Sequence, residues 1–359
     1  MYTDLSALSG DSEAGVAKMK INRENEYSFA VGVNQVIFSG TVFNAIKASG
    51  QYRKLTDFIY DASHQEIMTL ARKAYYQTIL LKLVWNVSLD SENNARENFE
   101  DIQQAFDNGL VSEFNLLQAE VRYKDKIPQA TEAERNYRIA LVNIKNLAGL
   151  PVDREINLTG DLDSYPEMPP LSSLEEACRL RPDFNALLWE EELRKTGVSA
   201  EKSAYFPTLS GSFTYAYSAQ SDRWRFDNDN NSYILGLNLS LPIFTGGARG
   251  ARVQKAKIEL NKTRLNIART RETIEKELRS IRLRLDEGYT RIQAADATVK
   301  TAQKAFKIAE TTSRAGLATQ LELKDSRIML DQATTGYYAA VYEYLDAYFD
   351  WQKAIGSVE

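Results

Sequence analysis

Few side chains in this 359-residue sequence have the type and spacing that chemistry requires. His64 is the one histidine and Cys178 the one cysteine, and neither has a cluster of potential partners nearby in the sequence. A metal centre or general-base catalysis needs several converging groups, and one cysteine cannot form an internal disulfide. The sequence therefore predicts no metal site, no cofactor and no enzyme activity. We interpret His64 as a solvent-facing helix residue and Cys178 as a packed thiol.

One acidic pair stands out, Glu322 and Asp325, directly after a glycine turn at Gly316. Two residues three positions apart share a face of a helix, so both carboxylates are expected to project on the same side. Two interpretations stay open at this point. The pair either serves a function that depends on concentrated negative charge, or is a solvated helix face with Lys324 beside it.

The acidic pair belongs to a chain in which strand-like segments pass directly into very long helices. Leucines alternate with small or polar residues from 235 to 241, the period of a strand with one apolar face. Apolar residues then recur at steps of three and four from Leu278 to Ala309, which is the seam of a coiled coil. Gly246 and Gly247 relieve the backbone where the strand ends and the helix begins.

The same junction occurs earlier, at residues 27–40, where alternating apolar residues lead to Phe38-Ser39-Gly40. Residues 108–116 likewise match residues 315–323. Because the spacing between the two landmarks is nearly equal in both halves, we infer an internal duplication. We assign residues 1–26 to a polar loop and the truncated start of the first repeat. The remaining assignments are the first repeat at 27–150, a proline-rich connection at 151–171 and the second repeat at 172–359.

Composition narrows the class of protein. A net charge of -5 argues against nucleic acid as a partner, and 26% charged residues with 8 prolines suit long charged helices. The sequence has no apolar run of about 20 residues, the length of a membrane-spanning helix, and its start lacks the features of a signal peptide. The first repeat also lacks counterparts of residues 172–217, so we expect an N-terminally incomplete copy.

The strands raise the question of what covers their apolar face. A strand pair attached to a helix about 100 Å long has no other element of its own chain to cover it. Strands of about ten residues with one apolar and one small, polar face are typical of outer-membrane barrels. An ordinary half-exposed hairpin in water shows the same alternation, but the attached long helices favour the barrel.

These features together resemble the TolC-like outer-membrane factor family. The resemblance rests on Arg181-Pro182-Asp183, Tyr205-Phe206-Pro207-Thr208-Leu209, Leu241-Pro242-Ile243-Phe244-Thr245-Gly246-Gly247 and the turn Gly316 to Asp325. It covers nearly the whole chain from Glu26 onward, although Val36-Ile37-Phe38 lacks the proline found at Pro242. It implies a mostly α fold with a minor β part: a long antiparallel coiled-coil α-barrel and a transmembrane β-barrel shared by a homotrimer.

The resemblance also implies a function. The chain would be an outer-membrane channel-tunnel subunit that extends into the periplasm, the passive exit duct of a tripartite efflux or type I secretion system. Its partners would be a periplasmic adaptor (membrane fusion) protein, an inner-membrane pump and outer-membrane lipid. In a trimer Glu322 and Asp325 would form carboxylate rings at the periplasmic constriction. The adaptor-docking tips would be Gly109, Leu110, Val111, Ser112, Gly316, Leu317, Ala318 and Thr319, and the lipid-facing strand residues Leu235, Leu237, Leu239 and Leu241.

Two alternatives remain. Exposed apolar residues at the tips also suit a hydrophobic helix-cap contact. A soluble coiled-coil scaffold or tethering protein would account for the seam, but it offers no reason for strands next to each long helix. The exported substrate cannot be inferred, because a passive duct leaves little specificity in the sequence.

Overall fold

The computed structural model describes residues 2–3, 19–20, 24–222, 229–315, 317 and 319–357. These residues form two compact units. The sheet unit comprises residues up to 53 together with 190–263, and the helical unit comprises residues 54–189 and 264–359. We describe each unit separately.

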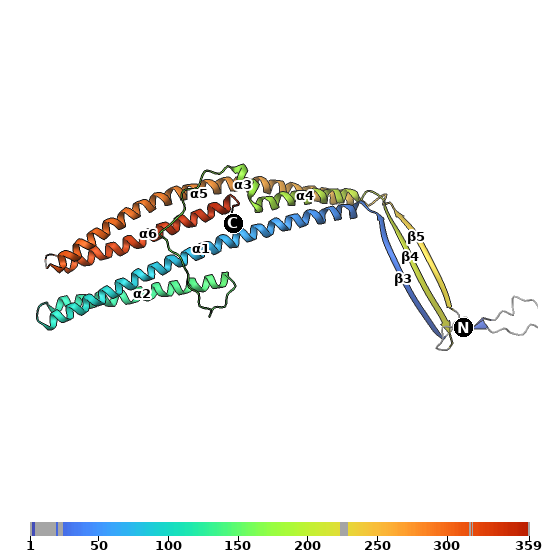
Figure 1. Ribbon diagram of the computed structural model, residues 1–359. Helices are drawn as coiled ribbons and strands as arrows, with labels where there is room; N and C mark the ends of the chain where they lie inside the picture. Colours follow the sequence, from blue (N-terminus) through green and yellow to red (C-terminus); the bar gives the residue numbers. More distant parts are fainter. Residues whose placement is uncertain are drawn as a thin grey trace, which may run out of the picture. The chain divides into compact units, whose positions relative to one another are not determined.

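The described residues from Asn25 onward show a strand leading into a long helix in each repeat, as predicted, and the fold is mostly α with a minor β part, as expected (Figure 1). Two long helices, α1 and α5, each contribute to both units. The elements are β1 (Tyr2–Thr3), β2 (Met19–Lys20), β3 (Asn25–Phe38), α1 (Gly40–Asp107), α2 (Glu113–Leu147), α3 (Leu174–Leu180), α4 (Pro182–Ser203), β4 (Thr208–Ser221), β5 (Asp229–Ser240), α5 (Ala248–Arg314) and α6 (Gln320–Ala354).

The sheet unit contains an antiparallel sheet in the order β3-β4-β5. The register places Val33, Phe213 and Leu235 side by side on one face. Asn34, Ser212 and Gly236 pair on the other face. A Cβ on Gly236 would lie 2.7 Å from the Ser212 hydroxyl oxygen, so a larger residue here would require that hydroxyl to move. The sheet therefore has the predicted apolar face and small, polar face.

A bulge at the end of β3 changes the expected alternation. Val36 pairs with Ser210, and the next paired residue is Phe38, opposite Leu209. Ile37 is the extra residue, and its side chain reaches within 3.2 Å of the position that a Cβ on Gly211 would take. A bulge adds one residue to one strand, so Ile37 and Phe38 both join the apolar face.

The helical unit has its core where α1, α5 and α6 meet the connection between the repeats. Leu285, Tyr344 and Leu162 are fully buried there. The predicted α5 seam is confirmed, because every residue in it is buried or half-buried, and the aromatic residues of α6 pack in or against the same core. In α1 the polar residue Thr78 is also buried, and its hydroxyl donates to the Ala74 carbonyl at 2.7 Å.

The connection at 151–171 is tied to three helices of this unit. The Tyr75 hydroxyl of α1 donates to the Thr159 carbonyl. The Tyr344 hydroxyl of α6 donates to the Pro166 carbonyl at 3.0 Å, and the Arg282 guanidinium of α5 donates to the Pro169 carbonyl at 2.8 Å. Buried carbonyl groups outside helices and strands need such donors, which explains how an irregular segment crosses the core.

Three expectations need correction. Residues 1–26 were expected to be a loop, but β1 pairs with β2 and β3 already begins at Asn25; residues 1, 4–18 and 21–23 lie outside the described residues. The aspartate- and asparagine-rich segment 220–232 predicts a loop, but β4 extends to Ser221 and β5 begins at Asp229; residues 223–228 lie outside the described residues. Leu241 follows β5 instead of lying in it. Ser240 pairs with Thr208, the first residue of β4, so no β4 residue remains to pair with Leu241.

Candidate functional sites

The turn between α1 and α2 is built by Gly109, whose φ of 71° is the left-handed conformation that favours glycine. The Gly109 amide donates to the Phe106 carbonyl, and the Leu110 amide to the Ala105 carbonyl, both at 2.8 Å. This pair of bonds defines a Schellman motif. Leu110 is nevertheless 77% exposed, so the hydrophobic cap contact considered from the sequence does not bury it.

The turn between α5 and α6 repeats part of this arrangement. The Leu317 amide donates to the Thr312 carbonyl at 2.9 Å, the equivalent of the Leu110 bond, and Leu317 is 83% exposed. The predicted tip residues Gly316 and Ala318 lie outside the described residues. Both turns thus present an exposed leucine.

The side chain of Glu322 has a structural role that our sequence analysis missed. Its carboxylate accepts from the Thr319 amide at 2.7 Å and the Thr319 hydroxyl at 2.9 Å, while the Glu322 amide donates to that hydroxyl oxygen. This is a capping box, whose signature of Thr followed three residues later by Glu was present in the sequence. The bonds from the Thr319 backbone and hydroxyl lower the pKa of Glu322.

Asp325 is exposed one helical step further along α6. Among the residues that the structure describes, it makes no ion pair, whereas Glu322 is held against Thr319. The two carboxylates therefore differ: one is oriented by the backbone and the other is free to face solvent or another molecule. The first repeat has Asn115 and Gln118 at the equivalent positions, so the acidic pair belongs to the second turn.

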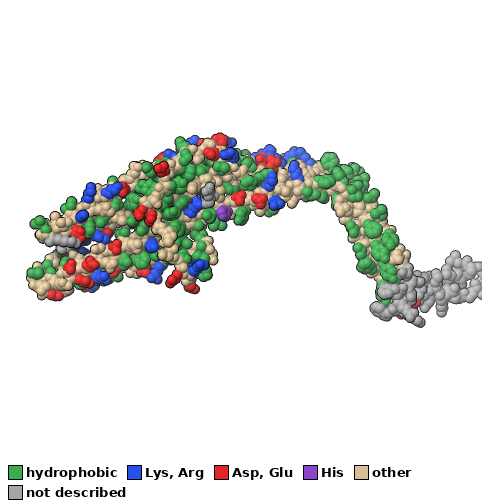
Figure 2. Space-filling view, in the orientation of Figure 1, with side chains coloured by type: hydrophobic (Ala, Val, Ile, Leu, Met, Phe, Trp, Pro, Cys, Tyr) green, Lys and Arg blue, Asp and Glu red, His purple; other side chains and the backbone are tan. Residues whose placement is uncertain are grey.

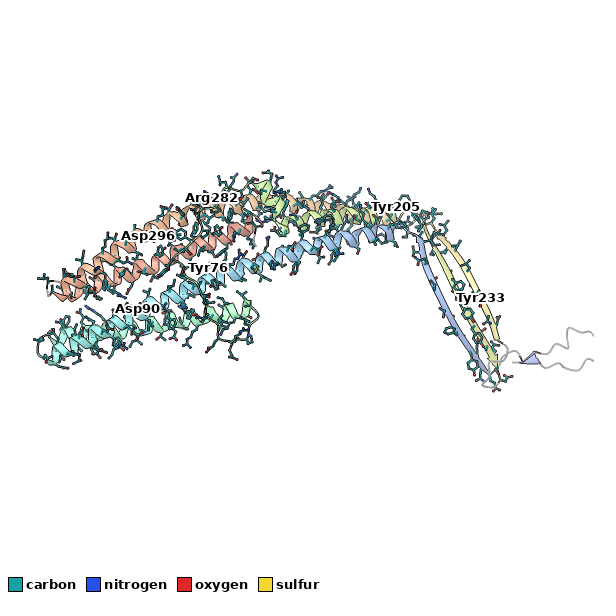
Figure 3. All side chains as sticks on the ribbon, in the orientation of Figure 1. Tyr76, Asp90, Tyr205, Tyr233, Arg282 and Asp296 are labelled. Carbon is teal, nitrogen blue, oxygen red and sulfur yellow. The ribbon has the colours of Figure 1, made fainter. Side chains whose placement is uncertain are left out.

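The strand residues predicted to face lipid are exposed in the sheet unit. Leu235, Leu237 and Leu239 are 81%, 74% and 67% exposed. Figure 2 shows hydrophobic side chains gathered over the strands. Tyr215 and Tyr233, which pair across β4 and β5, have ring centroids 5.2 Å apart, and Tyr233 is labelled in Figure 3. Aromatic residues on an apolar barrel face are typical of membrane interfaces.

Arg181 forms a second feature that we did not foresee. Its buried guanidinium bonds to Asp183 at 2.8 and 3.0 Å and to Glu277 of α5 at 2.7 Å. Burial favours neutral forms, but these hydrogen bonds and opposite charges outweigh it, so the pKa of Arg181 is raised and that of Asp183 lowered. The Arg-Pro-Asp motif therefore joins the α3–α4 break to α5.

A network of charges links α1, α5 and α6. Lys73 and Arg284 each contact both Asp346 and Asp350, at distances of 2.6 to 3.0 Å. Partners 62 to 277 positions apart cannot be inferred from a local motif. The network fixes α6 between two neighbours and leaves no unpaired nucleophile or base within it.

The predictions about His64 and Cys178 agree with the structure. His64 is exposed and stacks on Tyr60, with ring centroids 6.4 Å apart. Cys178 is half-buried, and burial raises its pKa. In the part of the chain that the structure describes, no group of three metal-binding side chains occurs, and no helix is apolar over a length that would cross a membrane.

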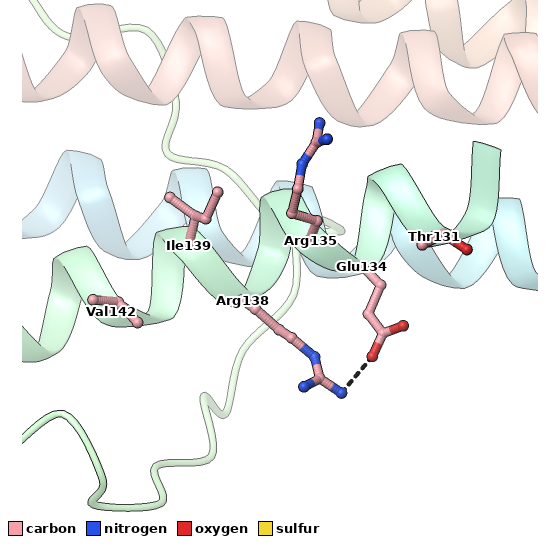
Figure 4. A pocket seen from close by; sticks show the side chains of 6 residues that line it. All are labelled: Thr131, Glu134, Arg135, Arg138, Ile139 and Val142. Carbon is pink, nitrogen blue, oxygen red and sulfur yellow. Dashed lines mark ion pairs between the residues drawn. The ribbon is translucent and has the colours of Figure 1, made fainter. Parts of the chain in front are cut away.

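A hollow of about 550 Å³ lies on the surface of α2. It is lined by one helix, and an ion pair of 2.5 Å between Arg138 and Glu134 crosses it (Figure 4). A catalytic pocket is concave and brings together groups from several elements. This hollow is lined by α2 alone, so it does not bring such groups together.

Comparisons with known proteins show which family this chain resembles. The model of the family described as outer membrane efflux protein matches residues 4–150 and 173–357. The chain is 22% identical to the alkaline protease secretion protein AprF of Pseudomonas aeruginosa over 334 residues, 90% of this chain and 68% of that protein. It is 20% identical to the outer membrane protein TolC of Escherichia coli over 346 residues, 93% of this chain and 70% of that protein.

Solved structures show the same fold. The CmeC outer membrane channel of Campylobacter jejuni has a TM-score of 0.81 and 18% identity, covering 99% of this chain and 76% of that one. VceC of Vibrio cholerae has a TM-score of 0.74 at 18% identity, with 99% and 84% covered. The predicted family, fold class and outer-membrane localisation are confirmed, and nothing in the comparisons supports the scaffold alternative. With a family match over most of its length and the strand-to-helix architecture of these channels, the chain belongs to the outer membrane efflux protein family.

Proposed function

We propose that three copies of this chain form one passive channel, with a shared barrel in the outer membrane and a helical tunnel in the periplasm. The observation that carries the proposal is the exposed apolar face of β3-β4-β5, where Leu235 is 81% exposed. Among the residues that the structure describes, β3 and β5 pair only with β4, so each keeps one unpaired edge. Lipid cannot satisfy free backbone groups, so strands of other copies are the natural partners for both edges.

The partners of this channel would be a periplasmic adaptor and an inner-membrane pump, and the chain would have no enzyme activity. Relatives are named as secretion and efflux pump proteins, which supports a role in one of these two kinds of system. The exposed leucines at the two turns, Leu110 and Leu317, supply apolar contacts for the adaptor. Because Leu110 is 77% exposed despite the helix-ending turn, docking is favoured over a cap contact.

Assembly is tested by extracting the protein from membranes. We expect a trimer that requires detergent, because the strand faces need lipid or its substitute. Mass measurement of the purified complex gives the number of copies. A monomer in the aqueous fraction would contradict the proposal.

The tips are tested in cells by replacing their exposed leucines. Leu110→Ser together with Leu317→Ser should lower export at unchanged channel abundance, because the apolar contact with the adaptor is weakened. The matched control is Val152→Ser with Leu171→Ser, which alters two exposed residues of the connection. Equal loss of export in both double variants would argue against docking at the tips.

We further propose that Glu322 and Asp325 form the periplasmic constriction. Three copies of each would create two carboxylate rings that attract cations. Single-channel conductance should fall when a multivalent cation is added, and Glu322→Gln with Asp325→Asn should remove this block and weaken cation selectivity. Glutamine can still complete a capping box, so the double variant removes charge without removing the helix cap.

The control for this experiment is Glu272→Gln with Glu287→Gln, two exposed acidic residues of α5. This control variant should leave the cation block of conductance intact, because the block depends on the carboxylates of Glu322 and Asp325 and not on the total negative charge of the chain. If the block persists unchanged in the Glu322 and Asp325 variant, these carboxylates are a solvated face. The trimer proposal would survive that result.

A further inference from the structure

Exposed apolar side chains lie where the strands of the sheet unit pass into its helices. Five of them, here called the collar, come from α1, from the turn after α4 and from the segment after β5. Ile243 and Phe244 are 93% and 88% exposed. Almost none of either apolar side chain is therefore covered by the described part of the chain. The collar consists of Phe43, Ile46, Phe206, Ile243 and Phe244.

The backbone that carries the collar is firmly held. The side-chain amide of Asn44 donates to the Ser203 hydroxyl at 2.8 Å, and a Cβ on Gly40 would lie 2.8 Å from the Cβ of Ser203. The buried Arg249 guanidinium donates to the Pro242 carbonyl at 2.7 Å and lies 5.3 Å from the centre of the Tyr205 ring (labelled in Figure 3). The segment with Ile243 and Phe244 is thus joined to α5 through Pro242.

Positive charge borders the collar on the helix side. Residues 40–56 of α1 and 248–258 of α5 contain no acidic residue. Figure 2 shows Lys and Arg side chains near this junction of the sheet unit. One nearby acid, Glu201, pairs with Arg252 at 3.6 Å. The exposed cations within the first two turns of α1 and α5 and the last turn of α4 are Lys47, Lys202, Arg252 and Lys255.

The distance from the strand–helix junctions to two of the cations suits a membrane interface. Lys47 and Lys255 each lie seven residues after the first residue of their helix, which is about 10 Å along the axis. The headgroup layer on each side of a bilayer is roughly 5 to 8 Å thick. Long Lys and Arg side chains can extend towards it while their stems cover apolar surface.

We propose that the collar and these four cations bind anionic phospholipid in the membrane leaflet on the helix side of the sheet. The collar inserts among acyl chains and the cations contact phosphate groups. A zwitterionic headgroup offers no net charge to a surface with a clear excess of cations, so charge complementarity favours the anionic lipid. This inference rests on the proposed membrane channel, and it adds the lipid class and the residues that select it.

The test compares insertion of the full-length protein into two kinds of vesicle, phosphatidylcholine alone and phosphatidylcholine with phosphatidylglycerol. At low salt the unaltered protein should insert into both and favour the anionic vesicles by about tenfold or more, a preference that high salt abolishes. Flotation of vesicles with bound protein measures the ratio. Lys47→Gln, Lys202→Gln, Arg252→Gln and Lys255→Gln together should remove the preference while leaving insertion into phosphatidylcholine unchanged.

A matched control keeps the change in net charge but moves it along the chain. Lys276→Gln, Arg279→Gln, Lys304→Gln and Lys307→Gln alter four exposed cations of α5 in the helical unit. This control should retain the preference. Unchanged preference in the collar-side variant, or equal loss in both variants, would overturn the inference. Failure of the unaltered protein to insert into either vesicle would instead overturn the proposed membrane channel.

Discussion

The sheet unit and the helical unit use the same residue type in opposite ways. Leu235 of β5 is 81% exposed, whereas Leu285 of α5 is fully buried. The helical unit covers its apolar seam with its own helices and connection, while the sheet unit leaves one face open. The difference teaches that periodicity shows which face is apolar, and that the neighbouring elements decide whether water, lipid or protein covers it.

The largest expected effect is in the helical core. Leu285→Ala should lower the free energy of unfolding by about 2 to 5 kcal/mol, because it leaves a cavity among residues that cannot fully collapse. Denaturant unfolding of the detergent-solubilised protein, followed by far-UV circular dichroism, measures the change. Leu283→Ala, at a position 70% exposed, should have a much smaller effect. Similar losses for both would mean that another copy covers Leu283.

The second test exchanges apolar and charged residues in the sheet. Leu237→Arg should cost roughly 2 to 4 kcal/mol if the residue lies at the bilayer midplane, because lipid cannot solvate the guanidinium. Asn238→Arg, on the opposite face, should be tolerated much better. The measurement is the stability of the protein folded in bilayers. Equal tolerance of arginine at both positions would show that the sheet lies in water and that the contrast with the helical unit is false.

A smaller effect on stability is expected at two glycines that have the same free space but different backbone conformations. A Cβ at Gly109 or at Gly336 would meet no atom within 4 Å, but Gly109 has a φ of 71° and Gly336 lies inside α6. Gly109→Ala should therefore cost about 1 to 2 kcal/mol. Gly336→Ala should instead stabilise by about 0.5 to 1 kcal/mol. Thermal unfolding of both variants tests the prediction, and changes of the same sign would contradict it.

The smallest expected effect is a dependence on pH within the helical unit. The folded protein lowers the pKa of Asp183 from 3.8 and that of Glu322 from 4.5. Their contribution to stability is therefore complete above these ordinary values and is lost as pH falls through the lowered ones. Unfolding measured between neutral and strongly acidic pH should show a decline that is shallower in Asp183→Asn. An identical decline in this variant would assign the acid sensitivity to other carboxylates.

Local features were predictable from the sequence to different degrees. The strands, the two long helices and the turn at Gly109 follow from periodicity and from glycine. The capping box of Glu322 had a visible signature, but we weighed Glu322 only as functional charge or as part of a solvated helix face. The sheet order, the bulge at Ile37 and the pairing of Arg181 with Glu277 depend on contacts between distant segments, which a single sequence does not reveal.

The central position of β4 has a consequence for how the chain reaches this structure. Val33 of β3 pairs with Phe213 of β4, so their contact closes a loop of 180 residues, the difference between 213 and 33. Contacts between such distant residues form slowly, because the entropy of loop closure must be lost before the pairing stabilises anything. The helices between them have local contacts and can form first. Before β3 and β4 pair, their apolar residues are exposed to other chains. We therefore expect β3 to depend on chaperones until it has paired with β4.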